Sequence, residues 1–273
     1  MSTTPPPPPG STATPPPQGE SVSVEGFDAT VSGDPAALYR ATVCRMMEAH
    51  AFRAVAQARL LGAGVVHSTG LRWMRFATHA ARECVEHYGG IAGCYEALAG
   101  QRLEPVVERR LRAEAPPLAQ SRAELAVAQL VSGRAWMWTL REHEACSFLP
   151  YRAVIAAMLR DVEARQTLAE RFLSEAVRHE GVGPCEAALG PWVDPALAAF
   201  GRGGTPGAAY ALSVGLRRRE VTLAVRECID DLKRVLGAAG LTAASVPALH
   251  VAEASGPEEG PPSRDTPESG GSL

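Results

Sequence analysis

Two polar clusters interrupt helical stretches that are otherwise apolar, and their residue types are the ones best suited to chemistry. In the first cluster, His79, Glu83 and either Glu86 or His87 are three to four residues apart. This spacing places them on one face of a helix. The second cluster spans residues 160–166 and again mixes carboxylates with arginines. If the buried faces of these helices meet, the two clusters form an ion site; otherwise they are surface residues.

The chemistry that such a pattern indicates is a pair of iron ions in a four-helix bundle. That site takes Glu-x-x-His from each of two helices and one carboxylate from each of two others. Oxygen-rich, anionic ligands stabilise the oxidised metals. This chain has Cys84-x-x-His87 and Glu163-x-x-Gln166 at the two paired positions. A thiol and an amide therefore replace one carboxylate and one imidazole, and the ligand set is degenerate.

The two remaining carboxylates should lie about 30 residues upstream of each pair, one helix plus one turn away. The first window holds His50 and Arg53, and the second holds Gln129. The nearest acids are Glu48 and Glu124. A buried arginine would repel divalent cations, so these windows also depart from a di-iron site.

The elements that must position these residues are predicted to be helices throughout, with no convincing strand. Ser121 and Glu124 form a capping box at one helix start. We expect helices over 34–61, 71–99, a short basic stretch within 105–117, 121–144, 150–180, a short helix capped by Asp194-Pro195, and 208–236. Antiparallel helix pairs are the economical packing for this pattern.

Length and composition predict one globular unit between two tails. The chain has 273 residues, of which 46% are apolar, and this is enough to bury one sizeable core. Residues 1–33 are rich in proline, serine and glycine, so we expect a disordered tail. We assign 34–245 to the helical domain and 246–273 to a second disordered tail.

Charge and cysteine usage exclude several classes of protein. A net charge of -3 does not indicate nucleic-acid binding, because proteins that bind nucleic acid usually have a basic face or stripe. The six cysteines form no close pairs, which argues against a disulfide framework or a zinc ribbon. Neither a secretory signal nor an apolar run of membrane-spanning length is present in the sequence. We therefore expect a cytoplasmic protein that does not bind membranes.

A resemblance to a known family rests on motifs spread over residues 36–240. The motifs resemble the catalytic subunit of phenylacetyl-CoA epoxidase, a phenylacetyl-CoA oxygenase of phenylacetate catabolism. They are Arg134-Ala-Trp136-Met-Trp138, Pro150-Tyr151, Glu163-Ala-Arg-Gln166, Gly181-Val-Gly-Pro184, Leu189-Gly-Pro-Trp192, Phe200-Gly-Arg202-Gly-Gly-Thr205, Tyr210, Gly215-Leu-Arg217-Arg218 and Val225-Arg226. The stretch Ala81–Tyr88 falls where that family carries its first Glu-x-x-His.

The resemblance implies a ferritin-like four-helix bundle with additional C-terminal helices. It also implies a relation to enzymes that insert oxygen into aromatic CoA thioesters. Carried over by position, His87 and Glu163 keep a ligand type, whereas Cys84 and Gln166 do not. No catalytic residue is assigned.

Three functions remain open on the sequence. The first is a non-catalytic homologue that acts as a scaffold, with a partner subunit or as a homodimer. The second is an oxygenase with an altered metal site, in which iron is the expected metal. The third is an acyl-CoA-binding bundle that uses Arg202, Arg217 and Arg218. Each set of residues also has a purely structural interpretation. His87 and Glu163 would then each belong to a buried hydrogen-bonded pair, and the arginines would lie on a solvated surface.

Overall fold

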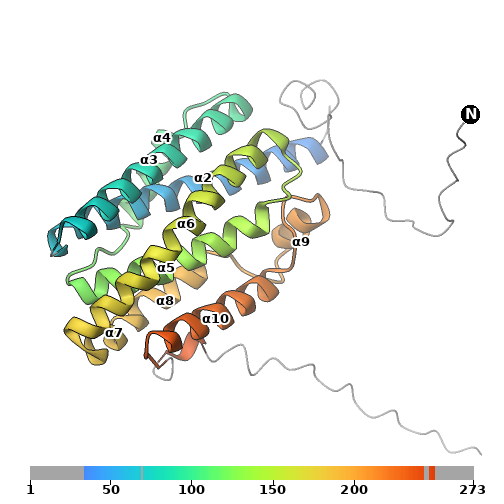
Figure 1. The fold of residues 1–273 in the computed structure, drawn as a ribbon. Coiled ribbons are helices and arrows are strands. Elements are labelled where there is room, and N and C mark those ends of the chain that lie inside the picture. Colours follow the sequence, from blue (N-terminus) through green and yellow to red (C-terminus); the bar gives the residue numbers. More distant parts are fainter. Residues whose placement is uncertain (1–33, 69, 243–245, 250–273) are drawn as a thin grey trace, which may run out of the picture.

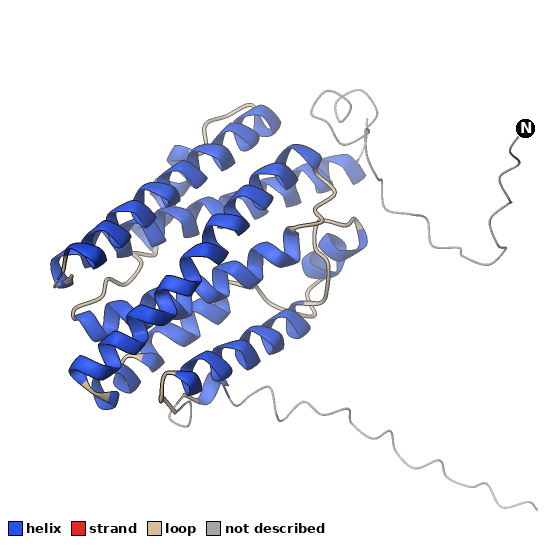
Figure 2. Ribbon diagram, viewed as in Figure 1, coloured by secondary structure: helices blue, strands red, loops and turns tan. Residues whose placement is uncertain are grey.

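The computed structural model describes residues 34–68, 70–242 and 246–249, and this part of the chain is helical without strands (Figures 1 and 2). The prediction of an all-α protein is confirmed. The elements in chain order are α2 (Asp34–Gly64), η2 (Val65–His67), α3 (Leu71–Ala99), α4 (Glu104–Ala113), α5 (Arg122–His143), α6 (Leu149–Glu180), α7 (Val182–Ala187), α8 (Leu189–Ala198), α9 (Pro206–Ser213), α10 (Val221–Ala238) and η3 (Pro247–Leu249).

Two pairs of long helices form the body of the molecule. Helix α2 packs along α3, and α5 packs along α6 (Figure 1). The pairs meet where α2 contacts α5 and where α3 contacts α6. Helices α7, α8 and α10 also contact α5, so this helix is enclosed on almost every side. Its sequence accordingly lacks a clear polar face, as expected for a central helix.

The core divides into two main clusters that share α5. One lies among α2, α3, α5 and α6 and is built around Trp136, Tyr151 and Met47. The other joins α5 to α8 and α10 through residues such as Leu130 and Trp192. The extra C-terminal helices are therefore integral to the packing.

The start of α5 follows the predicted capping pattern. The Ser121 hydroxyl accepts a hydrogen bond from the Glu124 amide at 3.1 Å. The Glu124 carboxylate reaches back to the amide of Gln120 at 2.7 Å and also accepts from the Trp192 indole at 3.0 Å. The cap thus also connects α5 to α8.

Two expected boundaries are wrong. Asp194-Pro195 does not start a helix, because α8 begins at Leu189 and Pro195 lies inside it. The last helix is not continuous either: α9 ends at Ser213, and α10 begins only at Val221.

Tertiary contacts explain the second break. The fully buried carboxylate of Glu142 pairs with Arg219. The backbone carbonyl of Glu142 accepts a hydrogen bond from the Arg218 amide at 2.8 Å. Gly215 adopts a left-handed conformation, with φ of 70°. Anchoring the segment to the end of α5 is incompatible with a continuous helix there.

The expected end of the domain at residue 245 also differs from the structure. Val246 and Leu249 are buried against the second core cluster. The helical body therefore reaches Leu249. The predicted tails, 1–33 and the remainder of 246–273, lie outside the described residues.

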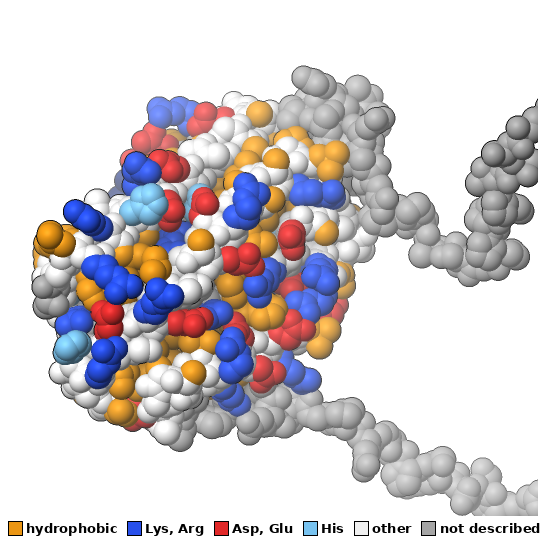
Figure 3. Space-filling model, viewed as in Figure 1, with side chains coloured by type: hydrophobic (Ala, Val, Ile, Leu, Met, Phe, Trp, Pro, Cys, Tyr) orange, Lys and Arg blue, Asp and Glu red, His pale blue; other side chains and the backbone are white. Residues whose placement is uncertain are grey.

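On the face seen in Figure 3, basic and acidic side chains are interspersed, so that face has no extended patch of one sign. No helix in the described ranges combines the length and hydropathy needed to span a bilayer.

Helices α5 and α6 approach closely at Gly133. A Cβ atom there would lie 2.1 Å from Nε2 of Gln166, whereas a Cβ at Gly93 on α3 would meet nothing within 4 Å. We predict that Gly133→Ala lowers the free energy of unfolding by about 1 kcal/mol, because the buried end of the Gln166 side chain must move to make room for the methyl group. Gly93→Ala should raise it by about 0.5–1 kcal/mol, because alanine is the better helix former. Chemical denaturation of both variants measures the contrast, and equal stabilisation by both would contradict this packing.

Candidate functional site

The predicted metal ligands lie at the contact between α3 and α6, but they do not converge. Cys84, His87 and Gln166 are buried. The side chain of Glu163 is 41% exposed and pairs with Arg141 of α5 at 2.7 Å. The prediction that Glu163 faces inward is therefore wrong.

The periodicity of α6 explains this error. Its buried positions at this level are Val162, Arg165, Gln166 and Ala169, which follow the helical repeat of three and four residues. Glu163 is one position away from this stripe. The inward pairs with i, i+3 spacing are therefore Val162 with Arg165 and Gln166 with Ala169, and none of these side chains is an anionic ligand.

Arg165 is the charged group at the centre of this contact. Its side chain is 5% exposed. Nη1 donates to the Cys84 sulfur at 3.0 Å, and Nε lies 3.7 Å from Oε2 of Glu83. Nε and Nη2 have no hydrogen-bond partner among the described residues. Burial raises the pKa of Cys84, and Arg165 only partly offsets this, so the sulfur is a neutral thiol.

His87 is held as a neutral imidazole that faces Asp161. Nε2 is 2.9 Å from Oδ2 of Asp161. Burial lowers the pKa of His87, and the hydrogen bond to Asp161 opposes this shift. In the neutral ring Nε2 donates to the carboxylate, which leaves Nδ1 buried without a described partner.

Neutral amides occupy the rest of the interior at this level. Gln129 on α5 and Gln166 on α6 are 3% and 2% exposed. Both amide ends of each lack a hydrogen-bond partner in the part of the chain that is described. These side chains provide no charge for a metal ion.

The residues present do not fit a di-iron centre. Among the described residues, no group of three or more His, Cys, Asp or Glu side chains is arranged to hold a metal ion. Of the further candidate donors, Glu48 accepts from the Tyr95 hydroxyl at 2.9 Å, and His79 pairs with Glu83 on the outer side of α3.

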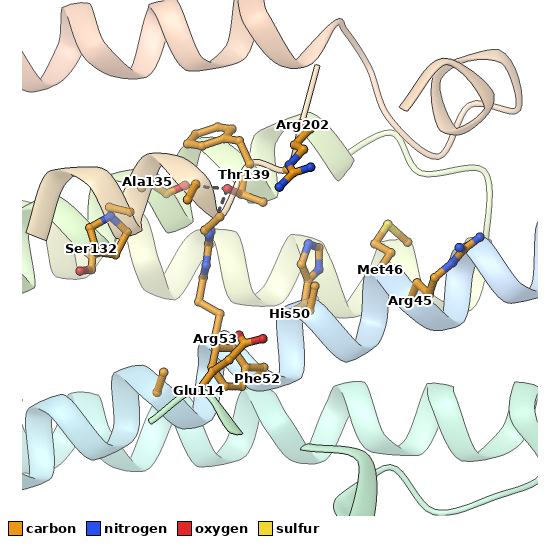
Figure 4. Close-up of a pocket in the computed structure, with 18 of the residues that line it drawn as sticks. Arg45, Met46, His50, Phe52, Arg53, Glu114, Ser132, Ala135, Thr139 and Arg202 are labelled. Atoms are coloured by element: carbon orange, nitrogen blue, oxygen red, sulfur yellow. Dashed lines mark hydrogen bonds between the residues drawn. The ribbon is translucent and has the colours of Figure 1, made fainter. Parts of the chain in front are cut away.

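A cavity of about 700 Å³ lies elsewhere, between α2, α5, the end of α4 and the α8–α9 segment. Its apolar wall includes Leu60, Trp192, Phe200 and Val221. Figure 4 shows Arg53 extending from α2 to Thr139 on α5, with His50 beside it and Arg202 on the segment after α8. The cavity thus combines apolar walls with cationic groups.

The arginines predicted to bind a cofactor have different environments. Arg202 and Arg217 line the cavity. Arg218 is exposed and does not line it. The neighbouring Arg219 forms ion pairs with Glu142 and Glu227 and holds the turn before α10 in place.

Two buried histidines line the inner end of the cavity. The rings of His50 and His143 have centroids 5.0 Å apart. Nδ1 of His50 is 2.7 Å from the Tyr151 hydroxyl, and Nδ1 of His143 donates to the Leu216 carbonyl at 2.8 Å. Burial lowers the pKa of His143 to about 4, and that of His50 well below its usual value. Both rings are neutral at pH 7.

The sequence predicted that Arg202 and Arg217 bind a ligand, but it did not predict which elements enclose the cavity. His50 and Arg53 were identified as polar residues, but they were assigned to the metal centre because of their distance from Cys84. The opposite wall comes from residues 192–221, and no local pattern indicates which helix face that segment covers.

The buried imidazole of His143 predicts acid sensitivity. As pH falls through about 6.5, the unfolded chain binds a proton on this residue, whereas the folded chain stays neutral until about pH 4. Stability is therefore full above pH 6.5 and declines below it, by on the order of 3 kcal/mol from this residue. His143→Gln should flatten the decline in urea unfolding measured from pH 7 to 4. His179→Gln is the control, since that side chain is exposed. Identical pH profiles for wild type and His143→Gln would contradict this account.

No protein-family model matches this chain, and no curated protein matches it significantly. The resemblance to phenylacetyl-CoA oxygenases therefore stays a prediction.

Proposed function

We propose that this chain is a ferritin-like bundle, related to the phenylacetyl-CoA oxygenases, that has lost its di-iron centre and acts as a non-catalytic member of that family. The paired packing of α2 with α3 and α5 with α6 is compatible with such a bundle. The family relation rests on the motifs of the sequence alone.

The observation that carries the proposal is the buried guanidinium of Arg165 beside Cys84 and Glu83. A divalent ion roughly 5 Å from this charge would be repelled by about 6–7 kcal/mol at an effective dielectric constant of about 20. The nearby carboxylates offset little of this repulsion, because Glu83 already pairs with Arg165 and Asp161 with His87, and the thiol, the imidazole and the two glutamines are neutral. The arginine thus supplies the positive charge that a metal would otherwise bring.

A scaffold also needs a surface for a partner. Leu71, Met74 and Val85 project from one outer face of α3 and are 70%, 38% and 58% exposed. Leu71 and Val85 are 14 residues apart, about 21 Å along the helix, so they mark the two ends of this face and do not form one continuous apolar patch. We assign this face to the partner subunit or to a second copy of the chain.

Metal analysis tests the proposal. The protein should be purified without chelator and supplied with iron, manganese and zinc. We expect fewer than roughly 0.2 metal ions per chain, because the interior lacks anionic donors and already contains a cation. The melting temperature should also be the same with and without a chelator. About two irons per chain, as in di-iron bundles, would overturn the proposal.

Acyl-CoA binding is a second candidate, favoured by the position of Arg202 and Arg217 on one cavity. Arginine recognises phosphate by paired hydrogen bonds. Coenzyme A should then raise the melting temperature, since a ligand that binds only the folded state stabilises it.

A further inference from the structure

The cavity between α2, α5 and the α8–α9 segment has an excess of positive charge. Of the described residues that line it, Glu114 is the one carboxylate, and it pairs with Arg110 at 3.2 Å. No described carboxylate lies within 4.0 Å of Arg53, Arg202 or Arg217. The cavity therefore contains guanidinium groups that form no direct ion pair with a described carboxylate.

The guanidinium groups of Arg53 and Arg217 lie in the same part of the cavity. Arg53 donates to the Thr139 hydroxyl at 2.8 Å, and Arg217 donates to the Phe200 carbonyl at 3.2 Å. The charges of both arginines act on His50 and on His143, whose rings are in contact. The guanidinium groups therefore both lie near the histidine pair at the inner end of the cavity.

Arg217 is not fully satisfied by the protein, whereas no nitrogen of Arg53 is left buried without a partner. Nε and Nη2 of Arg217 are buried without a described hydrogen-bond partner. Burial lowers the pKa of Arg53 to about 10 and also lowers that of Arg217, although nearby Glu142 favours the charged form of Arg217. Both remain charged at pH 7. Unpaired buried charge is costly, and an anion between the two would remove much of that cost.

The remaining wall determines what else the ligand must carry. Met46, Phe52, Leu60, Trp192 and Phe200 surround most of the space. A cavity of about 700 Å³ has the size typical of small-molecule sites, which combine apolar walls with a few polar groups. The mouth is marked by exposed Arg45 and Arg202.

We infer that this cavity binds an amphipathic acid, whose carboxylate or phosphate head lies between Arg53 and Arg217 and whose apolar chain packs against Leu60, Trp192 and Phe200. The inference goes beyond the proposed function, because it requires neither the family relation nor the absence of metal.

Calorimetric titration of the full chain tests the inference with decanoate, decyl phosphate, decanol and coenzyme A, each below its micelle concentration where it forms micelles. Decanoate or decyl phosphate should bind, and the tighter of the two identifies the head group. Decanol should bind at least about tenfold more weakly, because it lacks the charge that the arginines contact. Equal binding of decanol, or no binding of either acid at millimolar concentration, would overturn the inference. If coenzyme A binds but neither decanoate nor decyl phosphate binds, the inference is also overturned, and acyl-CoA binding is supported instead.

Variants locate the head group. Arg217→Gln and Arg53→Gln should each weaken binding of the tighter acid at least about tenfold. Arg218→Gln is the matched control, since the side chain of Arg218 is exposed and lies outside the cavity. The affinity of this variant should stay within about twofold of wild type. Should the buried variants fold poorly, Arg202→Gln at the exposed mouth gives an independent test through a weaker loss of several-fold. Unchanged affinity in every folded cavity variant would contradict the assigned position.

Discussion

The packing of α3 against α6 depends on one buried cation, the guanidinium of Arg165. It contacts the Cys84 thiol and lies 3.7 Å from Glu83, which is its one ion-pair partner among the described residues. A buried charge is tolerated only where the surrounding groups partly compensate it. The chemistry open to the bundle centre follows from this constraint, because an interior that already contains an arginine, and whose nearest carboxylate pairs with that arginine, is a poor site for metal ions.

The same constraint separates the two parts of the molecule that could have a function. At the α3–α6 contact the charged Arg165 has a carboxylate partner in Glu83, although its Nε and Nη2 have no hydrogen-bond partner among the described residues, and His87 pairs with Asp161. In the cavity beyond α2 and α5, by contrast, arginines face open space, and the carboxylate that lines it is already paired. Structural arginines such as Arg134, which pairs with Asp231 and Glu170, and Arg219 show the usual alternative, in which acids from neighbouring helices neutralise the charge. Arg53, Arg202 and Arg217 differ from these in that no described carboxylate forms a direct ion pair with them.

The sequence was informative wherever a local signal decides the structure. Helical periodicity predicted the two long helix pairs, and the Ser121 cap formed as its pattern indicates. Prediction from the sequence failed where a contact between residues distant in sequence determines the structure. The sequence predicts that Glu163 faces inward, because residue spacing alone does not reveal a one-residue change in helix register. The helix predicted over 208–236 is interrupted because Glu142 pairs with Arg219, which is 77 residues away. How the cavity is enclosed could not be predicted for the same reason, since its walls come from four separate parts of the chain.

The central claim is that Arg165 is an electrostatic partner of the α3 helix at the position where a metal would be expected. A double-mutant cycle with Arg165→Met and Glu83→Gln, measured by urea unfolding at low salt, tests it most directly. The account predicts a coupling free energy of at least about 1 kcal/mol between the two residues, because both are largely removed from water. Additivity of the two substitutions within about 0.3 kcal/mol would contradict it.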